Sequence, residues 1–313
     1  MTMRRVHWLP NLALIAICAA MIFPVFATAV ISFKRQADVT RKPPLLFPCD
    51  TPAADFDLFA CRFDAEGYDR LLTNRPDPNA LFGRIFADRL IGVFLPNTLL
   101  YATSAALLTS LLAGAAGYAF ARFEFRGRRA LQTTILLLTG MPLLTNLIAL
   151  YQLLVGARRA LAPLLGDGIA AFDRAALIII YTGLVLPFSI WIIKSFYDAI
   201  PRELEEAAQI DGCTPVGALL RVTAPIAAPG LFAAFLLTFV GVWNEFVVNY
   251  LIVGTARPEL RSAVVGLYSL TGTNLINYQV LAAACVLIML PVLLVFAAFR
   301  GVFFRAMTEG AVK

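Results

Sequence analysis

This sequence has almost no histidine and no phosphate-binding loop of the G-x-x-x-x-G-K-[ST] type, and each lack excludes a kind of active site. The 313 residues include one histidine, His7, so a catalytic or metal site built on clustered histidines is excluded. No stretch matches G-x-x-x-x-G-K-[ST], the loop whose backbone N–H groups cradle nucleotide phosphates. If ATP drives this protein, a separate subunit must bind and hydrolyse it. We therefore expect this chain to be no enzyme and to carry no cofactor or metal.

Charge is also scarce, and its scarcity indicates a membrane protein. Only 15% of the residues are charged and 60% are hydrophobic, whereas soluble domains carry roughly 25% charge. Apolar runs of about twenty residues recur, which is the length of a helix that crosses a bilayer. The Lys and Arg residues are scattered, so the net charge of +6 fits bases that meet membrane lipid headgroups rather than nucleic acid. The composition predicts an all-α integral membrane protein.

The apolar runs predict six transmembrane helices in three regions. Residues 1–33 are an N-terminal tail and an uncleaved first span, because this apolar run is too long for the core of a signal peptide. Residues 34–93 form a long periplasmic loop, and residues 94–313 hold the other five spans and a C-terminal tail, 305–313. Pro142 falls inside the third span, where we expect a kink. The expected spans cover residues 9–33, 94–120, 130–155, 175–196, 231–253 and 278–303.

Four arginines within eight residues indicate the orientation of the chain. Arg122, Arg126, Arg128 and Arg129 follow the second span, and short basic loops stay on the cytoplasmic side of a membrane. Both termini are then cytoplasmic, and the loop 156–174 is external, although its two neighbouring arginines weigh against this orientation. The arginine cluster either anchors its loop to lipid headgroups or docks a partner.

One polar stretch, Glu206–Pro225, interrupts the apolar C-terminal half of the chain. A helix is expected at 201–211, with acidic residues in the first turns where the helix dipole favours them, and Gly212 ends it. Thr214 is the expected N-cap of a second helix and Pro215 its first residue. The stretch thus predicts two short helices joined by a sharp turn. One face of each helix is expected to be buried through Leu204, Ala207, Ala208, Leu219 and Leu220.

The same stretch carries a motif with fixed spacing. The motif consists of Glu206, Ala207, Ala208, Gly212, Val222 and Pro225. It resembles the cytoplasmic coupling loop of permeases in ATP-driven importers fed by a binding protein, with Val222 and Ala224 where Ile and Leu are usual. The resemblance implies that loop 198–228 docks in a groove of an ATP-binding subunit. Glu206 would pair with a base there, the two alanines would allow close approach, and Gly212 would permit the turn. An ordinary helical hairpin between two spans is the alternative.

A second group of polar residues lies inside the expected fifth span. It comprises Trp243, Asn244, Glu245 and Asn249. A charged side chain within a span costs about 2.5–3.5 kcal/mol on insertion scales and marks a candidate functional site. The quartet resembles one in carbohydrate-type importer permeases, which implies that these residues face the translocation cavity and contact sugar hydroxyls. Alternatively, Glu245 pairs with a group on a partner permease. A proton relay is disfavoured because the other spans offer no second carboxylate or histidine.

The C-terminus and the long loop supply two further candidates. Glu309, Gly310 and Lys313 resemble the tail of the smaller permease in maltose-type importers, which implies contact with the ATP-binding pair; a disordered terminus is the alternative. Cys49 and Cys61 lie in the expected periplasmic loop, where an oxidising environment permits a disulfide, although both could also stay free.

The resemblance covers the first span and about residue 94 to the end, and it is to the second, smaller six-span permease of maltose-like transporters. It implies a type I ABC importer permease fold in the bacterial inner membrane. It also implies a complex with a second homologous permease, two ATP-binding subunits and a periplasmic solute-binding protein. The chain would translocate a sugar by alternating access, and a neutral sugar is favoured because we find no basic residue in the middle of the spans. Glycerol phosphate or another polyol, and an ion-coupled secondary transporter, are the alternatives.

Overall fold

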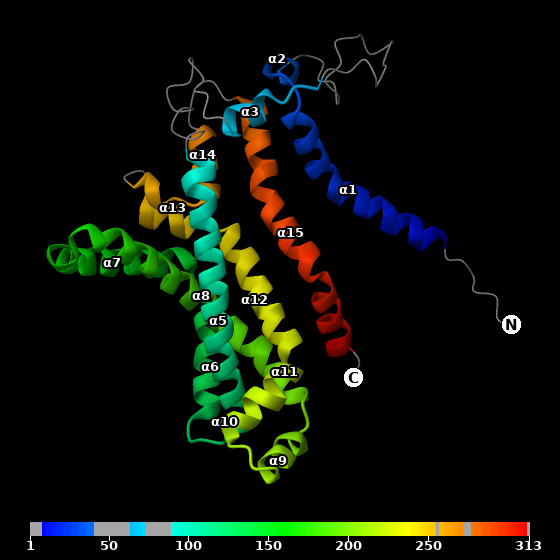
Figure 1. Ribbon diagram of the computed structural model, residues 1–313, viewed down its shortest axis with the longest axis vertical. Helices are drawn as coiled ribbons and strands as arrows, with labels where there is room; N and C mark the ends of the chain where they lie inside the picture. The colour runs from blue at the N-terminus through cyan, green and yellow to red at the C-terminus, as the bar shows by residue number, and fades with distance from the viewer. Residues whose placement is uncertain (1–7, 41–62, 73–88, 255–256, 272–276, 312–313) are drawn as a thin grey trace. The chain divides into compact units, whose positions relative to one another are not determined.

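The computed structural model describes residues 8–40, 63–72, 89–254, 257–271 and 277–311, and within them all regular structure is helical (Figure 1). This confirms the all-α prediction. The elements in chain order are α1 (Trp8–Ser32), α2 (Gln36–Val39), α3 (Glu66–Leu72), η3 (Leu90–Phe94), α5 (Leu95–Arg122), α6 (Arg128–Thr139), α7 (Leu143–Leu165), η4 (Gly166–Gly168), α8 (Ile169–Ala199), α9 (Glu203–Ile210), α10 (Pro215–Ala218), η5 (Leu219–Thr223), α11 (Ala224–Ile226), α12 (Ala228–Trp243), α13 (Val247–Val253), η6 (Pro258–Leu260), α14 (Ala263–Thr271) and α15 (Tyr278–Ala311).

The chain divides into two compact units. The first comprises residues 1–92 and 266–291, and the second comprises residues 93–265 and 292–313. In the first unit, α3 packs against the end of α1, where the hydroxyl oxygens of Ser32 and Tyr68 lie 2.7 Å apart. The amide of Gln279, at the start of α15, donates a hydrogen bond of 3.1 Å to the backbone carbonyl of Asp64. Three segments distant in sequence are thus held together in this unit.

The second unit is built around α5, α8 and α12, which lie side by side (Figure 1). Small residues allow these helices to approach closely, as is usual in membrane proteins. A Cβ atom at Gly230 of α12 would stand 2.3 Å from the ring of Phe196 on α8, and one at Gly117 of α5 would stand 3.1 Å from the Lys194 backbone nitrogen. Glycine is therefore required at Gly230 for α12 to pack against α8.

Two predictions between residues 130 and 174 need correction. The kink expected at Pro142 is a complete break, because α6 ends at Thr139 and α7 begins at Leu143. Proline lacks a donor N–H and its ring clashes with the preceding turn, which ends the helix there. The external loop expected at 156–174 is wrong, because α7, η4 and α8 make this segment helical. Its alanine, leucine and arginine residues favour a helix strongly enough that Pro163 lies inside α7.

The number of spans stays a prediction. Within the described residues, four helical stretches are long and apolar enough to cross a membrane: 10–32, 90–122, 143–199 and 278–301. A fifth is added if the pair 215–226 and 228–243, bent by 72°, is counted as one span. The tail expected at 305–313 continues α15 as helical backbone to Ala311.

Candidate functional site

The polar stretch between α8 and α12 folds as two short helices with a glycine turn, which confirms the local prediction. Gly212 has φ +90°, a left-handed conformation that glycine adopts without strain. Its N–H donates to the carbonyl of Gln209 (3.0 Å), and the N–H of Cys213 donates to that of Ala208 (3.0 Å), so the end of α9 is a Schellman motif. Thr214 caps α10 by accepting a hydrogen bond of 3.1 Å from the backbone N–H of Gly217.

This loop exposes large apolar side chains among its polar residues. Ile210, Val216 and Leu220 are 87%, 64% and 65% exposed. Leu204, Ala207 and Leu220 are exposed, which overturns the expectation that they are buried. The helices α9 and η5 bury Glu205 and Thr223 instead. Of the motif residues, Glu206, Ala207, Gly212 and Pro225 are exposed, while Ala208 and Val222 are half-buried.

Glu205, the neighbour of the motif glutamate, is buried. Its carboxylate oxygen Oε1 accepts from Arg122 Nε (2.7 Å) and from the Thr223 hydroxyl (2.8 Å), and Oε2 accepts from the Tyr118 hydroxyl (3.0 Å). Both Arg122 and Glu205 side chains are less than a tenth exposed. Burial raises the pKa of Glu205, but the hydrogen bonds and the charge of Arg122 outweigh it and hold the pKa below its ordinary value. The carboxylate is therefore ionised at neutral pH.

The same arginine connects three segments. Arg122 Nη2 donates to the carbonyl of Ile200 at the end of α8 (2.9 Å), and Arg202 Nη2 donates to the carbonyl of Ala121 on α5 (3.1 Å). The end of α5 and the start of the loop are thus bonded in both directions. The contact confirms that the basic turn after α5 and the motif stretch lie on the same side of the bundle.

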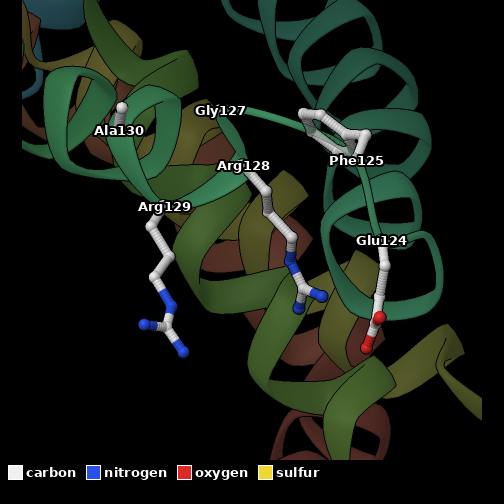
Figure 2. Close-up of a pocket in the computed structure, with 6 residues that line it drawn as sticks. All are labelled: Glu124, Phe125, Gly127, Arg128, Arg129 and Ala130. Carbon is white, nitrogen blue, oxygen red and sulfur yellow. The ribbon is translucent and has the colours of Figure 1, made fainter.

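The basic turn itself surrounds an open pocket of about 410 Å³ (Figure 2). Gly127 makes the turn with φ +85°. In Figure 2 the side chains of Arg128 and Glu124 extend in the same direction from opposite sides of the turn, and Arg129 lies parallel to Arg128. Arg128 and Arg129, together with the exposed Arg126, give the turn a positive charge that fits either lipid headgroups or a partner.

The polar quartet of the expected fifth span lies at a break between α12 and α13. Glu245 Oε1 accepts from the N–H of Val248 (2.9 Å), so this carboxylate caps the start of α13. Asn249 is buried and its Oδ1 accepts from the N–H of Ser262 (2.9 Å). Asn244 is exposed, whereas Trp243 is buried. Among the four, Asn244 is the exposed side chain, and a role of the quartet in a cavity or an interface stays a prediction.

The opposite end of α5 holds the segment 257–263. Asn97 Nδ2 donates to the carbonyls of Glu259 (2.8 Å) and Arg261 (3.2 Å), and the Tyr101 hydroxyl donates to that of Leu260 (3.0 Å). Figure 1 shows α13 at this end of α5, and α9 and α10 at the other.

A buried carboxylate also lies near this end. Asp173 Oδ2 pairs with Arg257 Nη1 and, at 3.5 Å, with Arg158 Nε, and Asp173 Oδ1 has no hydrogen-bond partner among the described residues. Arg158, one of the two arginines that weighed against the expected orientation, thus lies near a buried carboxylate, and the orientation stays a prediction.

Several predicted residues are described only in part. Cys49, Cys61 and Lys313 lie outside the described residues, so the proposed disulfide stays a prediction. Glu309 and Gly310 belong to α15. Sequence reasoning missed Glu205 because the motif draws attention to Glu206; the signal available was the pair Tyr118 and Arg122, polar groups four apart at the end of a span.

Residues 106–309 match the model of a family described as the binding-protein-dependent transport system inner membrane component. The chain is similar to the sulfoquinovosyl glycerol transport system permease protein SmoH of Agrobacterium fabrum, with 31% identity over 292 residues that cover 93% of this chain and 89% of the relative. It is also similar to the maltose/maltodextrin transport system permease protein MalG of Vibrio vulnificus, with 28% identity over 306 residues that cover 98% and 95%. The crystal structure of a bacterial ABC transporter involved in the import of the acidic polysaccharide alginate contains a similarly folded chain, with a TM-score of 0.66, 20% identity, and coverage of 96% of this chain and 98% of that chain.

Proposed function

The chain belongs to the family of binding-protein-dependent transport system inner membrane components, and on this basis we propose that it is the permease subunit of an ATP-driven sugar importer. The fold shared with the alginate transporter chain agrees with the expected ABC importer permease fold. Family membership disfavours the ion-coupled secondary transporter. The names of the relatives refer to sulfoquinovosyl glycerol and to maltose or maltodextrin, which supports a carbohydrate as the substrate of this chain. That the carbohydrate is neutral stays a prediction.

The observation that carries the proposal is the exposed apolar surface of the loop between α8 and α12. Burial of Ile210, Val216 and Leu220 against a partner would contribute favourable binding free energy, about 25 cal/mol per Å² of apolar surface removed from water. Glu206 lies exposed on the same helix and can meet a base on the partner. We propose that this surface docks on a cytoplasmic ATP-binding subunit, which hydrolyses ATP in place of this chain.

The remaining partners and the orientation follow from the same proposal. A second homologous permease, a second ATP-binding subunit and a periplasmic solute-binding protein complete the transporter. Both chain termini lie in the cytoplasm, and the C-terminal residues Glu309, Gly310 and Lys313 contact the ATP-binding pair. Trp243, Asn244, Glu245 and Asn249 belong to the cavity wall or to the interface with the second permease, and Asn244 is best placed because its side chain is exposed.

Uptake in intact cells tests the class of transporter. Cells that express the chain with its neighbouring genes are given radiolabelled maltose, and matched cells lacking this chain serve as the control. An ATP-driven importer continues to take up sugar when an uncoupler collapses the ion gradient, and it stops when ATP is depleted. The reverse pattern would contradict the proposal. If maltose is not taken up, the same comparison is run with a panel of labelled oligosaccharides and polyols.

Substitution of Gly212 by aspartate tests the role of the loop. Nothing lies within 4 Å of a Cβ at this position, so Gly212→Asp strains the backbone at φ +90° without a clash. The protein should remain in the membrane at normal abundance but lose transport-coupled ATP hydrolysis. Gly183→Ala, on α8 and equally free of neighbours, is the matched control and should behave as the unsubstituted chain. Normal uptake by Gly212→Asp at normal abundance would overturn the assignment of the loop.

A further inference from the structure

Glu205 and Glu206 are adjacent on α9 but have opposite surroundings. Glu206 is exposed on the surface that carries Ile210, whereas Glu205 is only 6% exposed. Acidic residues are rarely buried unless they are paired, and both oxygens of Glu205 are engaged by donors from α5 and η5. The loop therefore has an outer surface suited to a partner and an inner attachment whose buried charge is the Glu205 carboxylate.

This attachment joins the loop to a helix that is not adjacent to it in the sequence. The loop continues from α8 at Ile200 and leads into α12, while Tyr118 and Arg122 lie about eighty residues earlier on α5. The backbone of α9 packs against α10 and η5. From α9 to α5, the Glu205 carboxylate is held by both Tyr118 and Arg122.

The geometry resists any rotation of α9 relative to α5. Arg122 donates through Nε to Glu205 and through Nη2 to Ile200, so one rigid guanidinium group holds the end of α8 and the start of α9 together. Moving α9 would break hydrogen bonds to a buried charge, and an uncompensated buried charge strongly destabilises a protein. These bonds hold the start of the loop against the end of α5.

We propose that Glu205 is a positioning residue that makes α9 and the adjoining end of α5 move together when the ATP-binding subunits close. The proposal rests on the proposed function, because it assumes that the outer surface of the loop docks on an ATP-binding subunit. Movement of the loop is then passed directly to α5, and from α5 to α8 and α12, which pack along its length. Without Glu205, the movement would reach α5 through the Arg202 hydrogen bond to Ala121 and through the backbone at the two ends of the loop, and α9 would lose its buried ionic link to α5.

The test uses the assembled transporter, purified through this chain with its second permease and ATP-binding subunits and reconstituted in liposomes. Spin labels are attached at Glu203→Cys on α9 and Leu111→Cys on α5, both exposed positions, with the native cysteines replaced by serine. Pulsed EPR then measures the separation of the labels without nucleotide and with ATP and vanadate. The labelled parent should give one narrow distance distribution that is the same in both conditions.

Glu205→Ala should lose the narrow distribution specifically in the presence of ATP and vanadate, while the ATP-binding subunits stay bound. A residue needed only for folding would instead change the distribution in both conditions or reduce the amount of assembled complex. An unchanged distribution in both conditions would overturn the proposal. If Glu205→Ala does not assemble, Glu205→Gln, which keeps the size and one acceptor but removes the charge, decides by the same criteria.

Two further variants separate the proposal from the function on which it rests. Gln209→Ala, an exposed residue of α9, should match the parent. Glu206→Ala should weaken retention of the ATP-binding subunits and leave the nucleotide-free distribution narrow. If the unsubstituted chain does not retain ATP-binding subunits, the proposed function fails, and that outcome is visible before any Glu205 variant is measured.

Discussion

The two ends of α5 hold neighbouring segments by different chemistry. At the N-terminal end, Asn97 and Tyr101 donate to backbone carbonyls of the segment 259–261. At the C-terminal end, Tyr118 and Arg122 donate to the carboxylate of Glu205. A backbone carbonyl is present whichever residue occupies the position, whereas the carboxylate depends on one side chain. The first attachment should therefore tolerate substitutions in the held segment, and the second should fail when either charged partner is lost.

Loss of Arg122 is expected to have the largest effect. Arg122→Ala leaves the Glu205 carboxylate buried without its counter-charge, which costs about 3–5 kcal/mol in comparable buried pairs. The midpoint of thermal unfolding of the purified protein in detergent should fall accordingly. Arg126→Ala, an exposed arginine in the same turn, should change stability by no more than about 0.5 kcal/mol. Equal midpoints for the two variants would mean that the buried pair contributes nothing.

The same substitution at both ends of α5 measures the contrast directly. Tyr118→Phe removes a hydrogen bond to a charged acceptor, worth about 1.5–3 kcal/mol, and Tyr101→Phe removes one to a neutral carbonyl, worth about 0.5–1.5 kcal/mol. Both hydroxyls belong to buried tyrosines of one helix, and phenylalanine keeps the buried ring in both variants, so the two losses of stability compare the hydrogen bonds. Unfolding midpoints measured side by side should be lower for Tyr118→Phe. A larger loss at Tyr101 would reverse the comparison.

The smallest expected effect is the dependence on pH, above pH 5, of the stability that the Glu205 carboxylate contributes. The pKa of Glu205 is lowered in the folded protein, so the ionised carboxylate stabilises the fold above its unfolded pKa of about 4.3. That stability is lost only as the pH falls through the lower folded pKa. The difference in unfolding midpoint between the unsubstituted chain and Glu205→Gln should therefore stay constant from pH 8 to pH 5 and shrink below about pH 4. A difference that already disappears between pH 7 and pH 5 would show that the pKa is not lowered.

Local sequence was sufficient where local bonds decide the structure. Gly212, Thr214 and Pro215 were predicted to form a turn and a helix start, and the hydrogen bonds that form both run between residues three to five apart. The segment 156–174 was predicted as a loop because its glycines and Pro163 outweighed its helix-forming residues in that interpretation. In the fold, α7 and α8 meet through η4, and Pro163 lies inside α7. Pro187, further along the chain, likewise lies inside α8.

Contacts between distant segments could not be predicted from one sequence. Which of two adjacent glutamates is buried depends on where α5 ends, and α5 is more than eighty residues away from them. Likewise, the sequence predicts Glu245 to be a cavity or interface residue. It does not reveal the helix break after Trp243, where the Glu245 carboxylate caps α13. The partner of Asp173, Arg257, lies 84 residues later. In each case the decisive neighbour comes from another helix or from a break in the helix that periodicity does not reveal.

The closed set of hydrogen bonds around Gly212 and Thr214 has a consequence for how such loops can diverge. The turn is fixed by bonds among residues 208–217, and the loop is attached to α5 through Glu205 and Arg202 on the inner side. Ile210, Val216 and Leu220 take part in neither, and all three are exposed. Their identities can change without disturbing the shape of the loop or its anchorage. The outer residues can therefore vary to match different ATP-binding subunits, while the turn and the attachment to α5 stay the same.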